Sequence, residues 1–84
     1  MRLKLAVPLA FALLAGCGQS EGEKAEAELD LVLSGFPSPD EVCGAKRRVE
    51  QGYLRDGNKE KYQRWRVNAS LACNQADLDR LMRQ

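Results

Sequence analysis

Histidine is absent from this 84-residue chain, and aromatic residues make up only 6% of it. Without an imidazole, catalysis by a histidine base and metal binding through histidine are both excluded. The sequence also has no Cys-x-x-Cys pair, no glycine-rich phosphate loop and no adjacent nucleophile and base. The chain is long enough for one small domain. These features predict a protein that is not an enzyme and that needs no metal or other cofactor.

Long apolar stretches are also missing, with one exception at the amino terminus. Two cations, Arg2 and Lys4, precede residues 5–15, which are apolar apart from Pro8. This run is shorter than the roughly 20 residues that a helix needs to span a bilayer. Residues 1–16 are therefore predicted to be a signal peptide and not a permanent transmembrane segment.

The sequence Leu-Ala-Gly-Cys at residues 14–17 closes the apolar run. It resembles the lipobox of bacterial lipoproteins, and the resemblance covers residues 1–17 only. It implies cleavage before Cys17, a diacylglycerol on the Cys17 thiol and an acylated new amino terminus. Several acyl chains, such as palmitate, would anchor the protein essentially permanently. An ordinary secretory signal with an incidental cysteine is the alternative.

The residue after Cys17 is Gly18 and not aspartate, which resembles the outer-membrane sorting class of Gram-negative lipoproteins. We therefore expect the protein at the periplasmic face of the outer membrane. Loss of residues 1–16 removes two cations and changes the formal net charge from +1 to −1. This near balance argues against a nucleic-acid partner. Residues 17–24 are predicted to be the lipidated end and a flexible tether, and residues 25–84 one helical domain.

Two cysteines, Cys43 and Cys73, remain once Cys17 is lipidated. An even number of cysteines in an exported protein predicts a disulfide. Closing a loop of about 30 residues should stabilise the fold by ~3.5 kcal/mol on the chain-entropy account. A redox-active thiol is the weaker alternative, because no histidine is present to lower a thiol pKa.

Two stretches after the tether have clear helical patterns. Between Ala25 and Phe36 the apolar residues recur every three or four positions, and Gly35 and Pro37 should end that helix. Ser38, followed by proline and then by glutamate three residues on, predicts a capped helix start. This second helix should end at Gly57, and residues 42, 45, 49 and 53 should form its buried face.

Residues 59–73 fit two patterns. Apolar residues at 65, 67, 69, 71 and 73 alternate as in a strand, but those at 62, 65, 69, 72, 73 and 76 share a helical face. The predicted disulfide distinguishes the two. Cys43 lies about 21 Å before Gly57 along a helix, and Cys73 lies about 24 Å after it if helical but about 53 Å if extended. A disulfide requires Cα atoms within ~7 Å, so the helix is favoured. We expect this helix to end and a new short helix, capped by Asn74, to follow. The predicted fold is therefore all-α: a disulfide-stapled α-hairpin with a short helix on each side.

The function that best fits these features is a non-catalytic interaction or structural module of the bacterial cell envelope, with an envelope protein as its partner. Val67 and Leu71 lie off the predicted core face and could contact that partner or the first helix. The sequence leaves the oligomeric state open. A second candidate surface, for an acidic protein or anionic lipids, consists of cations in the hairpin: Arg47, Arg48, Arg55, Lys59, Lys61, Arg64 and Arg66.

A different class of function also remains open. Small anchored lipoproteins can inhibit a cell-wall hydrolase or exclude conjugation machinery. Trp65 and Cys73, eight residues apart, resemble a spacing in the helical periplasmic lysozyme inhibitors. Ala69 stands where that family has arginine, and the shared stretch is too short to transfer an inhibitory site.

Overall fold

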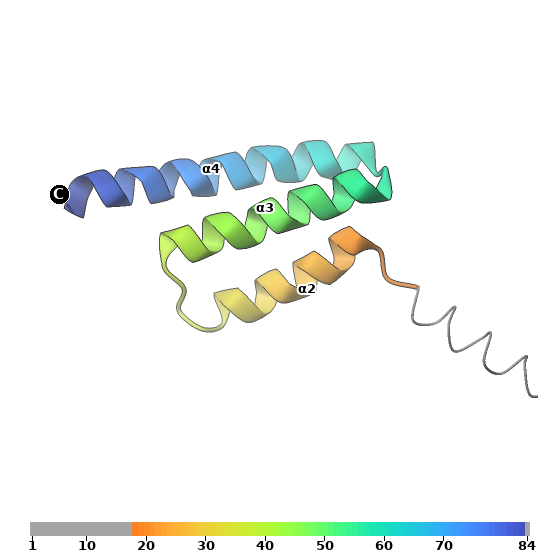
Figure 1. The fold of residues 1–84 in the computed structure, drawn as a ribbon, viewed down its shortest axis with the longest axis horizontal. Helices are drawn as coiled ribbons and strands as arrows, with labels where there is room; N and C mark the ends of the chain where they lie inside the picture. The colour runs from red at the N-terminus through yellow and green to blue at the C-terminus, as the bar shows by residue number, and fades with distance from the viewer. Residues whose placement is uncertain (1–17, 84) are drawn as a thin grey trace, which may run out of the picture.

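The computed structural model describes residues 18–83, which contain three α-helices and no strand. They are α2 (Glu21–Leu33), α3 (Pro39–Asp56) and α4 (Lys59–Arg83) (Figure 1). The all-α fold class predicted from the sequence is confirmed. The predicted signal peptide and Cys17 lie outside the described residues.

The three helices lie side by side in one layer, with α3 in the middle (Figure 1). Both α2 and α4 pack along α3, and within the described part of the chain they do not pack on each other. Short connections, residues 34–38 and 57–58, make each neighbouring pair antiparallel. The layer is therefore open, and the outer side of α4 faces away from the rest of the domain.

Capping residues set the helix boundaries. Ser38 and Glu41 form the predicted capping box, and Gly57 ends α3 in the left-handed conformation, at φ 74°. A second capping box, formed by Ser20 and Glu23, starts α2 at Glu21. The prediction of a flexible tether through residue 24 is therefore wrong for residues 21–24, which form the first turn of α2.

The strand alternative for residues 59–73 is ruled out, because α4 is helical from Lys59 to Arg83. The predicted break at Asn74 is also wrong, and the expected fourth helix is the last part of α4. One asparagine costs only a few tenths of a kcal/mol in a helix interior. A continuous helix keeps the backbone hydrogen bonds that a break would lose. It also keeps Ala72 and Ala76 buried on one face.

The core is small and lies along α3. Val49 and Tyr53 are its largest fully buried side chains. From α2, Ala25 and Leu29 are buried, and Val32 packs against the same cluster. From α4 the buried face consists mainly of alanines: Ala69, Ala72 and Ala76. In the amino-terminal half of α4, the rings of Tyr62 and Trp65 pack against the core. These are the residues of the predicted helical face.

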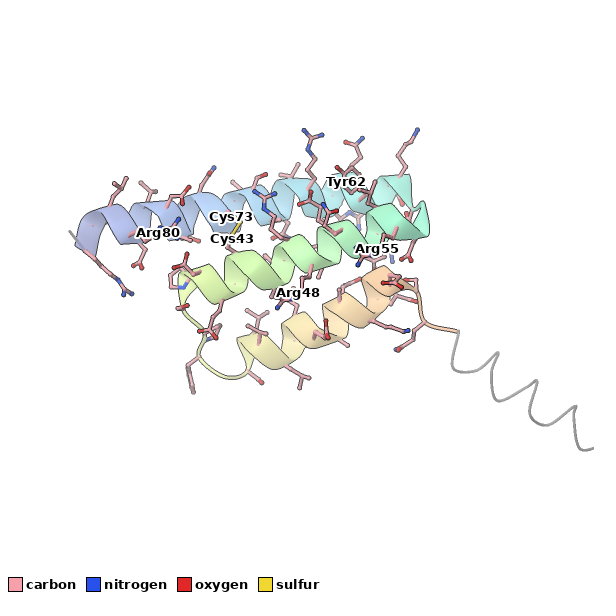
Figure 2. All side chains as sticks on the ribbon, in the orientation of Figure 1. Cys43, Arg48, Arg55, Tyr62, Cys73 and Arg80 are labelled. Carbon is pink, nitrogen blue, oxygen red and sulfur yellow. A yellow bond between two sulfur atoms is a disulfide. The ribbon has the colours of Figure 1, made fainter. Side chains whose placement is uncertain are left out.

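The disulfide between Cys43 and Cys73 joins α3 to α4 (Figure 2). The two Cα atoms are 4.6 Å apart, within the range that a disulfide permits. Because α4 has 25 residues and α3 has 18, α4 extends past the start of α3. Arg80 reaches back from this extension, with its Nη1 2.6 Å from Oδ1 of Asp40.

Two glycines allow α2 to approach α3 closely. A Cβ atom on Gly52 would lie 2.8 Å from the carbonyl oxygen of Glu21. On the other side of the contact, the ring of Tyr53 occupies the space that a side chain on Gly22 would need. Glycine in a helix interior normally costs about 1 kcal/mol relative to alanine. Here the missing side chains allow the two backbones to meet.

We predict that Gly52→Ala lowers the free energy of unfolding by about 1–3 kcal/mol, because the added methyl group overlaps the backbone of α2. Urea unfolding followed by circular dichroism measures the change. Gly44→Ala is the matched control, since a Cβ there meets only the flexible end of Arg48 at 3.8 Å. That control should be neutral or stabilise by up to about 1 kcal/mol. Equal effects of the two substitutions would contradict the close approach.

We also predict that replacing both Cys43 and Cys73 by alanine lowers the free energy of unfolding by about 3.5 kcal/mol, since the bridge closes a loop of about 30 residues. Reduction of the unmodified protein should cause a similar loss. The same reductant should leave the double variant unchanged, which controls for other effects of the reagent. A protein equally stable with and without reductant would show that the bridge contributes nothing.

Candidate interaction surfaces

The amino terminus of α2 is held by a carboxylate from the end of α3. Asp56 accepts hydrogen bonds from the backbone N–H groups of Glu21 and Gly22, each at 2.9 Å. The guanidinium of Arg55 lies 3.4 Å from a carboxylate oxygen of Glu21. The Gly22 bond, followed by the Glu21 bond, holds the pKa of Asp56 below its ordinary value. The chain that leads to Cys17 therefore starts beside the turn between α3 and α4.

Tyr53 connects all three helices at the same end of the domain. Its ring lies on Gly22, its hydroxyl donates a hydrogen bond to Glu26 of α2, and the ammonium of Lys61 in α4 lies 5.3 Å from the ring centroid. Burial, and then the hydrogen bond to Glu26, raise the pKa of the Tyr53 hydroxyl. These contacts fix the end of the layer at which α2 begins.

The predicted cationic residues do not form one face. Arg47 pairs with the buried Glu50 at 3.2 Å, and Arg55 and Lys61 make the contacts described above. Arg64 and Arg66 are two positions apart on α4, so their side chains leave the helix roughly 160° apart. Arg48 lies on α3 and Lys59 begins α4 (Figure 2). The cations are therefore distributed around the hairpin.

The outer side of α4 carries a line of large exposed apolar side chains, which we call the outer stripe: Val67, Leu71, Leu78 and Leu81. Their side chains are 57–66% exposed. They lie opposite the alanine face that packs on α3, and α2 does not reach them. Sequence reasoning found Val67 and Leu71 but missed that the line continues, because it expected the helix to break at Asn74.

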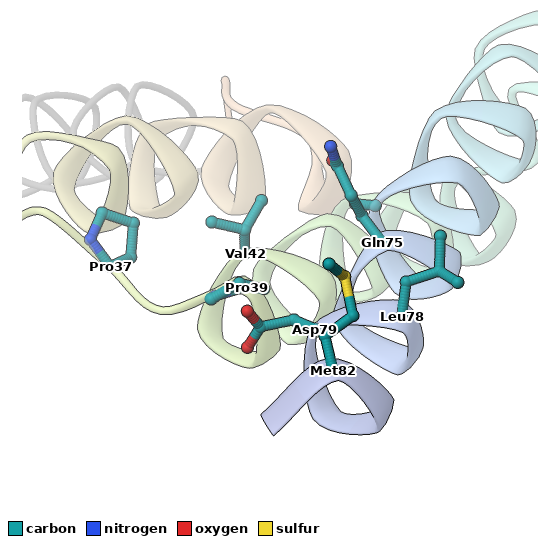
Figure 3. Close-up of a pocket in the computed structure, with 8 residues that line it drawn as sticks. Pro37, Pro39, Val42, Gln75, Leu78, Asp79 and Met82 are labelled. Carbon is teal, nitrogen blue, oxygen red and sulfur yellow. The ribbon is translucent and has the colours of Figure 1, made fainter. Parts of the chain in front are cut away.

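A second apolar surface, which shares Leu78 with the outer stripe, lies between the start of α3 and the last turns of α4. This distal groove has a volume of about 570 Å³. Pro37, Pro39 and Val42 come from the α3 side, and Leu78 and Met82 from α4 (Figure 3). Ala72, Gln75 and Asp79 complete the lining. Sequence reasoning did not identify the groove, because its two walls are about 40 positions apart in the chain.

Phe36 lies in the connection that leads into the groove. Its side chain is 97% exposed, and its φ is 54°, in the left-handed region. The sequence predicted Phe36 on the buried face of the first helix, and that prediction is wrong because α2 ends at Leu33. An aromatic residue in this conformation is rare and costs of order 1 kcal/mol or more. The backbone therefore presents an aromatic ring to solvent next to an apolar groove.

Comparisons with known protein families, with curated proteins and with solved structures found no match to this chain. Between residues 18 and 83, no group of His, Cys, Asp or Glu side chains is arranged to hold a metal ion. In the same range, none of the helices is long and apolar enough to cross a bilayer. The two apolar surfaces, the outer stripe and the distal groove, are the features of these residues that bear on function.

We predict that Asp56→Asn destabilises the protein at pH 7, because the amide loses the charged bonds to the start of α2. A carboxylate with a lowered folded-state pKa stabilises above its unfolded pKa of about 3.9, and this contribution is lost as the pH falls through the lower, folded value. The stability difference between the unmodified protein and the variant should therefore shrink below about pH 4.

Urea unfolding between pH 2 and pH 7 measures this difference. Asp30→Asn is the matched control, because Asp30 is an exposed acid of α2 whose carboxylate accepts no hydrogen bond within residues 18–83. That control should change stability little at any pH. A difference for Asp56→Asn that stays constant down to pH 2 would contradict the proposed cap.

Proposed function

We propose that this protein is a lipid-anchored, non-catalytic interaction module of the bacterial cell envelope. In this proposal Cys17 carries the lipid, and the distal groove binds an apolar segment of another envelope protein. The observation that carries the proposal is the pairing of an open apolar groove with the exposed, strained Phe36 beside it. Backbone strain of this kind is often found at binding sites, where the fold holds a residue ready for a partner.

The chemistry of the groove suits an apolar ligand. Two prolines, a valine, a leucine and a methionine provide most of its surface, and Asp79 is its one charged residue. Prolines keep the α3 wall rigid, whereas the flexible thioether of Met82 can adapt to different shapes. A leucine or aromatic side chain of a partner would be buried in the groove, and the same partner would cover the neighbouring ring of Phe36.

The position of the groove relative to the anchor also supports the proposal. Only three residues, Gly18 to Ser20, separate Cys17 from α2, and such a stretch spans at most about 11 Å. The start of α2 is held at the turn between α3 and α4. The start of α3 and the last turns of α4, which line the groove, lie at the opposite end of the layer (Figure 1). A lipid on Cys17 would therefore hold the turn near the membrane and leave the groove accessible to a partner.

The experiment is site-specific photo-crosslinking in bacterial membranes. We expect a photoreactive residue in place of Met82 or Phe36 to give a discrete adduct with a partner protein other than a second copy of this chain. The same residue in place of Glu28, an exposed position on α2, should give none. Pro39→Asp should reduce the Met82 adduct at least about tenfold, the effect of ~1.4 kcal/mol in binding, because it places an unpaired charge in the groove.

Two outcomes would contradict the proposal. If Met82 and Glu28 give the same adducts, the groove has no specific partner. If Cys17→Ala leaves the amount and membrane location of the Met82 adduct unchanged, the lipid anchor has no part in the interaction. The identity of a captured partner would further distinguish a structural role from inhibition of a hydrolase or of conjugation machinery.

A further inference from the structure

The outer stripe has the spacing of a coiled-coil seam. Val67, Leu71, Asn74, Leu78 and Leu81 follow one another at intervals of four, three, four and three residues. A helix with apolar residues at this 3.5-residue average presents a continuous line to a second helix. One polar residue, Asn74, interrupts the line in its centre, and a buried polar side chain favours the register in which it finds a hydrogen-bonding partner.

No part of the described chain covers this line. Its residues point away from the alanine face of α4, and α2 packs only on α3. The four apolar side chains of the outer stripe are each more than half exposed. Any group that shields them from water is therefore not part of residues 18–83.

The residues beside the seam favour a second copy of this chain. In a parallel pair, Gln63 of one copy would flank Asn68 of the other, and Ser70 would flank Gln75. The one acid in these flanking positions, Asp77, would lie beside Met82. No like charges oppose each other between Val67 and Leu81, so two identical helices meet there without repulsion. A partner selected by charge would instead need charged flanking residues.

The position of the anchor selects the parallel orientation. α4 is 25 residues long, about 37 Å, and the connection to Cys17 begins at its amino-terminal end. With the layer upright on the membrane, as proposed above, an antiparallel pair would place one of the two anchor points about that length from the bilayer, and a tether of about 11 Å cannot bridge this distance. A parallel pair places both anchors at one end. Arg64, one heptad before Leu71, then limits the seam at its amino-terminal end.

We propose that two copies of this protein pair in parallel through the outer stripe, with Asn74 of each copy facing Asn74 of the other. This inference rests on the proposed lipid anchor. The seam is about 21 Å long, only two heptads, so its contacts alone are weak. Two chains held in one membrane leaflet are at a high effective concentration, which favours such a short interface.

The test is disulfide crosslinking of variants of the full-length chain that each carry one added cysteine, expressed in bacteria and oxidised in isolated membranes. We expect Val67→Cys and Asn74→Cys to give at least tenfold more covalent dimer than Arg66→Cys, which lies about 100° around the helix from Val67. The unmodified protein gives the background from its own cysteines. Adding Leu71→Glu and Leu81→Glu to Asn74→Cys should lower the dimer at least tenfold, while circular dichroism stays helical because both leucines are exposed.

The orientation is read from the same variants. In a parallel pair both Val67→Cys and Asn74→Cys form dimers. In an antiparallel pair centred on Asn74, the two Val67 positions are about 21 Å apart, so crosslinking at Asn74 alone would overturn the parallel arrangement. If Val67→Cys and Asn74→Cys both give no more covalent dimer than Arg66→Cys, self-pairing is overturned. If Met82 still gives its specific photo-adduct in that case, the proposed function stands and only the dimer fails.

Discussion

The arrangement of the whole layer depends on the place that Tyr53 occupies. It is 1% exposed, and it contacts both neighbouring helices, through Glu26 on α2 and Lys61 on α4. Its ring can lie on α2 only because Gly22 has no side chain. A chain this short buries a smaller fraction of its surface than a larger domain does, so one aromatic residue supplies a large share of the packing that holds α2 and α4 to α3.

The thin core and the exposed surfaces have the same origin. Three helices in one layer bury only the sides that face α3, and α4 contributes mainly alanines to that contact. Small side chains bring α4 close to α3 but bury little area, so the Cys43–Cys73 bridge adds stability that the core lacks. Four larger apolar residues of α4 are left exposed on its outer side: Val67, Leu71, Leu78 and Leu81. Those residues form the outer stripe, and the extension of α4 past α3 forms one wall of the groove.

Much of the fold follows from local signals. The capping box at Ser38, the glycine at position 57 and the pairing of Cys43 with Cys73 were all predictable, because each depends on neighbouring residues or on chain length. The errors have physical causes too. Asn74 looks like a helix start, but a polar residue that costs little in a helix cannot stop one that is packed on both sides of it. The capping box at Ser20 is a local signal of the same kind. The polar composition of residues 18–24 nevertheless suggested a tether there.

The sequence by itself determined an all-α domain with a bridged hairpin, because periodicity, caps and cysteine spacing act over a few residues or through simple chain geometry. It also carries the amino-terminal pattern from which the lipid anchor is proposed. Only the tertiary structure decided that α2 packs on α3 alone, that Phe36 is exposed, and that Pro39 and Met82 share a groove. Such features depend on which helix faces meet, and that follows from the packing of distant residues such as Gly22 and Tyr53, which no local pattern records.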